Sequence, residues 1–196
     1  MLERLQALTS DAVCLDVPDM LMFAYCSGGV AMIADLQAAW LKWQTPRLVR
    51  RHGFRSVAVG EYESPEPNWA YTVGFWESVQ APEVIVFDVT VEAAASLLWS
   101  AYSDLKSGEL TLRDGQAWEG FEGFLSVWRR VHPSRIDDTD NWFALARWYR
   151  GKKTRREDLQ ALQLVLPDAA GAFPWEPAYD ERLRHLQPAL YLPAAV

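Results

Sequence analysis

Two neighbouring segments between Asn68 and Val89 carry the clearest pattern of apolar and polar positions in the chain. The first alternates bulky side chains with small ones: Trp69, Tyr71, Val73 and Phe75 against Ala70, Thr72 and Gly74. Because successive side chains of a strand point to opposite faces, this pattern predicts a strand over residues 69–76. One face would be heavy and buried. The other would be nearly bare, so that a helix or a ligand could approach the backbone closely.

The second segment predicts a strand over residues 83–89. It holds the continuous apolar run Val84–Phe87, which is typical of a strand covered on both faces. The two strands are joined by residues 77–82. A loop of that length suits an antiparallel connection, since a parallel one needs a dozen residues or more.

Apolar residues spaced three or four apart predict helices elsewhere. The first runs from about Val30 to Gln44 and would bury Ile33, Leu36, Trp40 and Trp43. A second helix then starts at Thr45-Pro46, with Thr as the N-cap and Pro at the first helical position, and ends at Gly53. His52 lies at the C-terminus of this second helix, where the helix dipole favours a cation. Another helix begins after the cap Thr90, ends at Gly108 and buries Val91, Ala94, Leu98, Ala101, Tyr102 and Leu105. A further helix runs from about Asp140 to Arg150 with Gly151 as its cap, and turns Trp142, Leu145, Ala146 and Tyr149 inward.

Shorter strands are expected at Phe54–Gly60, Glu109–Leu112, Leu125–His132 and Leu159–Leu166, and an irregular tail rich in Pro and Trp follows. Together these elements predict an α+β fold with a mainly antiparallel sheet packed with helices. Residues 1–52 are expected to form a helical N-terminal extension packed on the core, and residues 53–196 the α+β domain. Met32 is a conceivable alternative start, which leaves open whether the residues before it belong to the native fold.

Composition sets limits on the class of protein. Half of the 196 residues are apolar and ten are Trp, which is ample material for a core. The net charge of −7 disfavours a dedicated nucleic-acid binder and an anionic membrane surface. The two cysteines, Cys14 and Cys26, are too few for a disulfide scaffold. With no recognisable signal peptide and no membrane span, these features predict a cytoplasmic protein.

Several of these segments resemble one protein family. They are AYTVGFWE, PEVIVF, the helix that ends at Gly108, and LQLVLPDAAGAFPWEPAYD near the C-terminus. This set is similar to the uncharacterised bacterial family of domain of unknown function 4262, over about Gly53 to Pro193. The chain departs from the family at Asp88-Val89-Thr90, where members tend to have Gly-Leu-Pro, and at Leu166 and Ala178, where they tend to have Trp and Gly. The resemblance implies a cytoplasmic bacterial protein and brings no reaction, substrate or cofactor.

Candidate chemistry gathers around the predicted hairpin. Glu77 and Glu83 flank one loop, and a carboxylate pair can perform general acid–base catalysis, here with Tyr71, if burial separates the two pKa values. The alternative is that both carboxylates lie in a solvated turn. The candidate ligand-binding residues are Thr72, Trp76 and Trp175. Thr72 could instead pair across strands, and Trp175, held in the stiff FPWEP motif, could instead pin the tail to the core.

Other signatures of chemistry are missing from the sequence. His52, His132 and His185 are far apart, no metal-ligand spacing occurs, and there is no nucleophile elbow or glycine-rich phosphate loop. We therefore expect no metal and no cofactor. The one basic cluster, Arg147–Arg156, is either a nucleic-acid contact or a solvated helix end.

These observations favour a non-catalytic binding or protein-interaction domain. Its partner would be an unknown protein or small molecule, and a homo-oligomer stays open. A small-molecule enzyme that uses Tyr71, Glu77 and Glu83 is the alternative.

Overall fold

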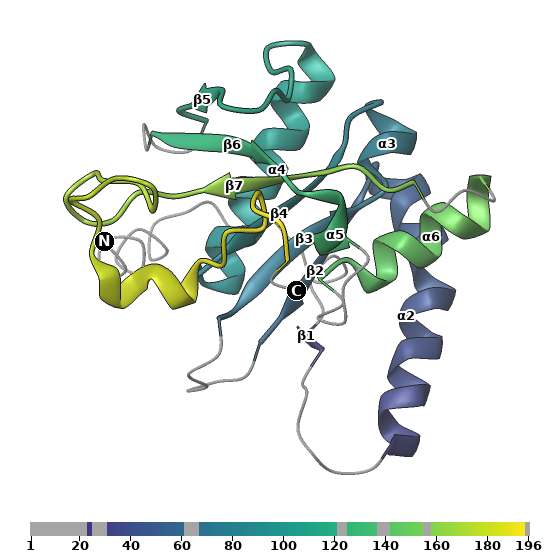
Figure 1. The fold of residues 1–196 in the computed structure, drawn as a ribbon. Coiled ribbons are helices and arrows are strands. Elements are labelled where there is room, and N and C mark those ends of the chain that lie inside the picture. The colour runs from purple at the N-terminus through teal and green to yellow at the C-terminus, as the bar shows by residue number, and fades with distance from the viewer. Residues whose placement is uncertain are drawn as a thin grey trace.

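Seven strands form one mixed sheet in the described part of the chain, in the order β1-β2-β3-β4-β7-β6-β5 (Figure 1). The computed structural model describes residues 23–24, 31–60, 67–120, 125–136, 142–154 and 158–194, and of residues 23–24 and 31–37 it describes the backbone only. Cys14 and Cys26 lie outside these ranges, so the prediction that they form no disulfide scaffold stays a prediction.

The strands are β1 (Phe23–Ala24), β2 (Arg55–Val59), β3 (Trp69–Val73), β4 (Glu83–Phe87), β5 (Ala117–Trp118), β6 (Ser126–Arg130) and β7 (Ala161–Val165). The helices are α2 (Ala31–His52), α3 (Phe75–Ser78), α4 (Val91–Ser107), α5 (Pro133–Ile136), α6 (Ala144–Thr154) and the 3-10 helix η1 (Glu181–Leu186). Neighbouring strands are antiparallel except in the pairs β1–β2 and β4–β7. The predicted α+β fold is therefore confirmed, as is the antiparallel pairing of β3 with β4.

Both faces of the sheet are covered by helices (Figure 1). On one face, Ala70 of β3 and Val84 of β4 pack with residues of α4. On the other, Tyr71 and Ile85 pack with residues of α2 and α6. The predicted continuous burial of residues 84–87 is confirmed, because all four side chains are fully buried.

The predicted strand over residues 69–76 is too long. Trp69, Tyr71 and Val73 do share one face, but Phe75 packs in the opposite core. Gly74 causes the change, because its φ of 108° turns the chain into α3. Such a conformation is one that glycine adopts readily. The bare face of β3 meets a helix, because α4 packs against β3.

Residues 31–52 form one helix instead of the predicted two. Thr45 is not an N-cap: it is fully buried within the helix, and its hydroxyl donates to the carbonyl of Leu41 at 2.7 Å. The buried Arg55 guanidinium donates to the same carbonyl at 3.1 Å and to the Thr45 hydroxyl at 3.1 Å. Pro46 lies within this helix, where it removes one backbone donor.

The prediction of which side of α2 is buried is wrong as well. Trp40 and Trp43 are 42% and 58% exposed, whereas Leu48 and Val49 are buried. The side chains of Ile33 and Leu36 lie outside the described part of the chain.

The helix after Thr90 is confirmed at both ends. The Thr90 hydroxyl accepts a hydrogen bond from the N–H of Ala93, and Gly108 has the left-handed conformation of a C-cap. Its buried stripe includes Ala93 and Leu97 in place of the predicted Val91 and Leu105.

Other predicted elements also differ from the structure. Residues 109–112 form no strand. The helix predicted from about Asp140 to Arg150 begins at Ala144 and continues through Gly151 to Thr154. Basic side chains, Lys152 and Lys153, occupy the last turn of α6, where they complement the helix dipole.

The C-terminal tail is irregular, as predicted, apart from η1, and two buried glutamines join it to β7. The side-chain amide of Gln187 pairs with both the N–H and the carbonyl of Leu166, at 2.8 and 3.0 Å. Gln163, on β7, donates to the carbonyl of Pro188 and accepts from the N–H of Leu190. These amides satisfy backbone groups that would otherwise be buried without partners.

Candidate functional site

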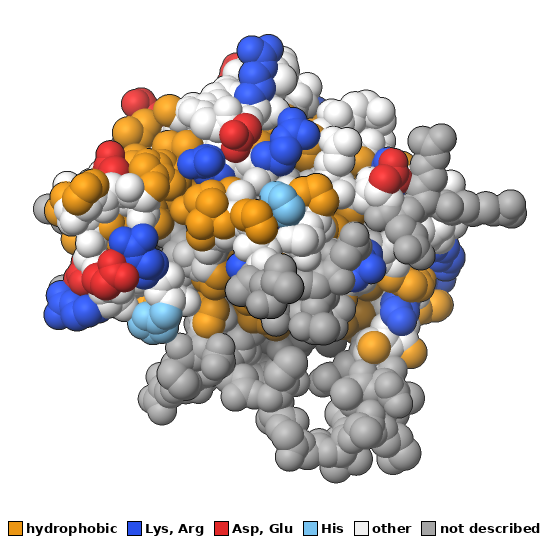
Figure 2. All heavy atoms as spheres, viewed as in Figure 1, with side chains coloured by type: hydrophobic (Ala, Val, Ile, Leu, Met, Phe, Trp, Pro, Cys, Tyr) orange, Lys and Arg blue, Asp and Glu red, His pale blue; other side chains and the backbone are white. Residues whose placement is uncertain are grey.

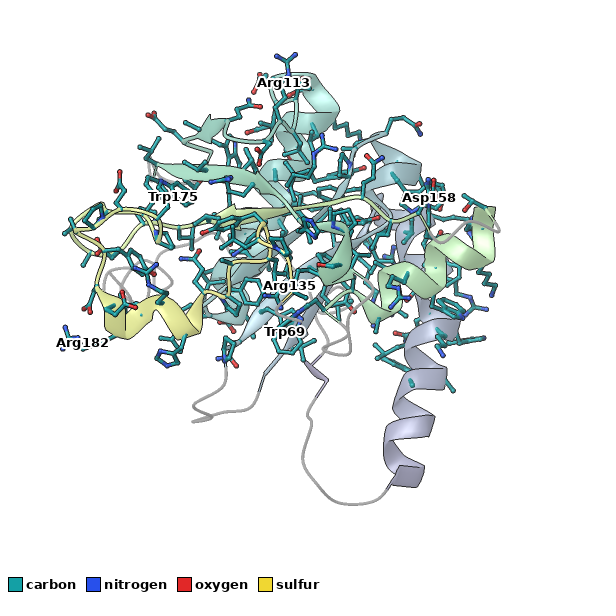
Figure 3. All side chains as sticks on the ribbon, viewed as in Figure 1. Trp69, Arg113, Arg135, Asp158, Trp175 and Arg182 are labelled. Carbon is teal, nitrogen blue, oxygen red and sulfur yellow. The ribbon has the colours of Figure 1, made fainter. Side chains whose placement is uncertain are left out.

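A hollow of about 250 Å³ opens between α3, α6 and the segment that leads into β7. It is lined by Trp76, Gln80, Ala81, Pro82, Arg150, Asp158, Leu159 and Gln160. Figure 3 shows Asp158 beside α6, at the right-hand edge of the molecule. Two regions that are far apart in the sequence, residues 76–82 and 150–160, therefore contribute to one concave surface, which is the usual form of a small-molecule site.

Arg150 and Trp76 form the polar and aromatic wall of the hollow. The Arg150 guanidinium carbon lies 4.3 Å from the centroid of the Trp76 ring, a cation–π contact that holds the side chain in place. Its Nη2 is 3.8 Å from Oδ1 of Asp158, too far for a direct hydrogen bond. Arg150 is 20% exposed and Asp158 58% exposed, so the cation is held more firmly than its anionic partner.

Two buried N–H groups in this wall make no hydrogen bond to any described residue: Nε1 of Trp76 and Nε of Arg150. Buried donors without an acceptor are uncommon in native proteins, because each costs free energy. Gln80, also in the wall, has a left-handed φ of 55°. Such conformations are unfavourable for residues other than glycine and recur near functional sites.

Glu83 lies behind the hollow and is 1% exposed. Its carboxylate accepts a hydrogen bond from the Thr72 hydroxyl at 2.6 Å, and others from the N–H groups of Gly74 at 2.8 Å and Phe75 at 3.3 Å. Burial raises the pKa of this carboxyl to about 7, although the bonds from Thr72, Gly74, Phe75 and Trp76 lower it. Glu83 therefore anchors the turn from β3 into α3.

Glu77, one residue after Trp76, has different partners. Its carboxylate accepts from the Tyr149 hydroxyl at 2.5 Å and from Lys153 at 2.9 Å. Partial burial works to raise the pKa of Glu77, but these bonds outweigh it and hold the pKa below its usual range. The side chain thus links α3 to α6 beside the hollow.

Tyr71 is buried in the core on the α6 side of the sheet. Burial raises its pKa to about 12, and its hydroxyl accepts a hydrogen bond from the N–H of Leu145 at 3.3 Å. Tyr71, Glu77 and Glu83 each contact their own partners, and none of the three lines the hollow.

The candidate ligand-binding residues lie in different places. Trp76 lines the hollow, and Thr72 bridges two strands by donating to Glu83 and accepting from the N–H of Val84. Trp175 lies on the opposite side of the molecule from Asp158 (Figure 3). It is 41% exposed and stacks on the buried Phe173 with ring centroids 5.0 Å apart, so the deeper anchor of the tail is Phe173.

Sequence reasoning did not identify Arg150 and Asp158 as parts of one site. Arg150 was grouped with the basic cluster Arg147–Arg156, of which Arg155 and Arg156 lie outside the described residues. Asp158 follows that cluster and carries no motif of its own. No local spacing connects either residue with Trp76, because the fold alone brings α3 and α6 together.

A metal centre is not formed within the ranges that the structure describes, since no three His, Cys, Asp or Glu side chains there are placed to hold an ion. None of the described helices is long and apolar enough to cross a membrane.

One comparison with known proteins is informative. A family model described as Domain of unknown function (DUF4262) matches residues 48–180. The match begins earlier than the resemblance seen in the sequence, which starts at Gly53, and ends before Pro193. No curated protein and no solved structure matches the chain.

Proposed function

Since this chain belongs to the DUF4262 family, whose description carries no activity, we propose from the geometry of the site that it is a non-catalytic binding domain. The ligand is a small molecule with a carboxylate or another anionic oxygen group, held in the hollow by Arg150 and Trp76. The observation that carries this proposal is the arrangement of one fixed cation and one loosely held anion across a concave surface.

The chemistry of Arg150 sets the class of ligand. A guanidinium recognises a carboxylate or phosphate through two parallel N–H donors. The 3.8 Å separation from Asp158 leaves such bonds unmade, and the exposed Asp158 side chain can move away at little cost. An oxygen of the ligand would also give an acceptor to the buried Nε of Arg150 or Nε1 of Trp76.

A panel of small carboxylates and phosphates, each paired with its neutral amide or alcohol, tests this function by thermal shift and by chemical-shift changes at the Trp76 indole N–H. At least one anionic member should bind and its neutral partner should not. Arg150→Met should abolish that binding. Asp158→Asn should tighten it, because the competing carboxylate is gone. Equal binding of anionic and neutral partners, or full binding by Arg150→Met, would refute the assignment.

A small-molecule enzyme is the second candidate, and one observation favours it. Burial raises the pKa of Glu83 to about 7, where a carboxyl serves well as an acid or base, and Glu83 directly follows Pro82 in the wall of the hollow. Turnover of a bound ligand that is lost in Glu83→Gln, while binding is kept, would select this function over simple binding.

The setting that we propose is the cytoplasm of a bacterium. The small number of cysteines and the resemblance to a bacterial family support it. A protein partner or a homo-oligomer is compatible with the same binding role. Native mass spectrometry of the chain purified from its host would report both a retained small molecule and the oligomeric state.

A further inference from the structure

A second surface, which we call the α2–α6 face, lies apart from the hollow. We give this name to two neighbouring groups on helices that pack against each other. The first is Trp40, Trp43 and Arg47 along α2, and the second is Trp148 and Lys152 of α6, whose indole Lys42 of α2 also reaches. Figure 2 shows hydrophobic and basic side chains intermingled at the right-hand edge, where Figure 1 places these helices. Trp40 and Trp43 are 42% and 58% exposed. Large aromatic side chains are therefore presented to solvent in a basic setting.

The helix geometry explains why these rings face outward. Trp40, Trp43 and Arg47 are spaced three and four residues apart, so they form one stripe along α2. The opposite stripe is buried against the body of the molecule, with Leu48 8% exposed and Thr45 fully buried. The aromatic stripe therefore adds nothing to the core of the described domain.

Charge is strongly segregated toward this face. Residues 38–52 and 144–154 contain eight Lys and Arg residues and no Asp or Glu. Two of these cations, Lys153 and Arg150, lie on the side of the hollow and have acidic neighbours there, Glu77 at 2.9 Å and Asp158 at 3.8 Å. The net charge of −7 thus conceals a local basic surface, which can attract an anionic partner even when the whole protein is acidic.

Three of the cations on these two helices rest on indole rings. The Arg47 guanidinium carbon is 4.2 Å from the centroid of Trp43, and the Nζ atoms of Lys42 and Lys152 are 5.8 and 5.0 Å from that of Trp148. A cation over an aromatic ring keeps its full charge, unlike a cation paired with a carboxylate. The rings and the charges are therefore interleaved.

This interleaving decides between the occupants that an exposed helix stripe can have. A second copy in a symmetric contact would place basic residues against basic residues, which costs free energy. A membrane-surface helix separates its apolar and basic faces, whereas here Arg47 lies over Trp43 on one stripe. An acidic peptide would satisfy the charges but carries no regular row of aromatic bases to stack on the indoles.

We propose that the α2–α6 face binds single-stranded nucleic acid, with bases stacked on Trp40, Trp43 and Trp148 and phosphates bound by the neighbouring Lys and Arg side chains. Such binding combines a basic track with aromatic platforms and needs no particular base sequence. It revises the expectation drawn from net charge, because local charge governs binding within a Debye length. The proposal does not depend on the function assigned to the hollow.

Fluorescence anisotropy of a labelled oligo-dT of about 20 nucleotides, titrated with the full chain, tests this inference. If about four phosphates are neutralised, Kd should rise about 50-fold between about 50 mM and about 200 mM salt. Trp43→Ala and Trp40→Ala should each weaken binding about 5-fold or more, through lost stacking. Arg47→Glu and Lys152→Glu should weaken it further and reduce the salt dependence.

Two residues on α4 provide matched controls. Trp99 is 38% exposed. The Nζ atom of Lys106 lies 5.7 Å from the centroid of the Tyr102 ring, a cation–π contact like those of Lys42 and Lys152 with Trp148. Trp99→Ala and Lys106→Glu should leave Kd within about 2-fold, and circular dichroism should show all variants folded. The inference is overturned if the chain does not bind the oligonucleotide at low salt, or if the α4 variants lose binding equally. Equal binding of polyglutamate or of vesicles rich in phosphatidylserine would also overturn it, in favour of the peptide or membrane occupant.

Discussion

The buried carboxyl of Glu83 should make the protein less stable as the pH rises from about 5 to about 8. The pKa of this group is about 7 in the folded protein, against an ordinary value of 4.5 for a glutamate in water. Between these values the folded state holds a proton that the unfolded state has released. The free energy of unfolding therefore falls with rising pH across this window.

The magnitude follows from the difference between the two pKa values. Each pKa unit corresponds to about 1.4 kcal/mol, so full ionisation of Glu83 should lower the free energy of unfolding by about 3 kcal/mol. The physical origin is desolvation, since the side chain is 1% exposed, and the hydrogen bonds from Thr72 and the backbone offset only part of that cost. Among the described residues, Asp88 titrates in the same window with the same sign, because burial raises its pKa to about 6.

Urea unfolding of the wild type and of Glu83→Gln at a series of pH values separates the two groups. Glu83→Gln removes the Glu83 titration, so its stability should fall much less between about pH 5 and pH 8 than that of the wild type. Asp88→Asn, which tolerates the left-handed φ of 55° at this position, should reduce the remaining slope. Glu77 and Asp168 do not interfere, because their pKa values are lowered and their transitions lie at more acidic pH. An identical pH slope in the wild type and in Glu83→Gln would refute the reasoning.

Three further predictions concern stability, each measured by urea unfolding. Asp168→Ala should cost about 2–4 kcal/mol, because the carboxylate accepts three backbone N–H bonds that shape the tail; Asp168→Asn, which keeps one acceptor oxygen, should cost less, and equal losses would contradict this account. Phe173→Ala should cost about 3–5 kcal/mol and Trp175→Ala only about 1–2 kcal/mol, since Phe173 is 7% and Trp175 41% exposed; the reverse order would show that Trp175 anchors the tail. Gly74→Ala should cost about 1–3 kcal/mol or more, because φ is 108° and the added Cβ would lie 2.7 Å from a methyl group of Val49; unchanged stability would show that the turn into α3 can relax.

Local patterns predicted the parts of the fold that depend on local physics. The helix between Thr90 and Gly108 was predictable at both ends, because its cap residues are satisfied within a few positions of the chain. The β3–β4 hairpin followed from a connection too short for a parallel crossover. The full burial of residues 84–87 followed from a run with no polar side to face water.

The candidate site was predictable only in part. Trp76 was among the candidates, but its partners Arg150 and Asp158 were not recognised as belonging to the same site. Glu83 was recognised as a candidate carboxylate, yet neither its burial nor its bond to Thr72 can be read from a residue that simply begins a strand. Proximity between α3 and α6 depends on how two helices pack on one sheet, and no spacing in the sequence encodes that distance.

The sequence by itself determined the α+β class, the central hairpin and the helix that begins after Thr90, because strand alternation, loop length and helix caps act over a few residues. Tertiary structure decided the order of the strands, with β7 between β4 and β6, and which side of α2 is buried. It also converted Glu83 from an ordinary loop carboxylate into a buried one. These properties depend on contacts between distant segments, where burial and desolvation are set by whatever else the fold brings close.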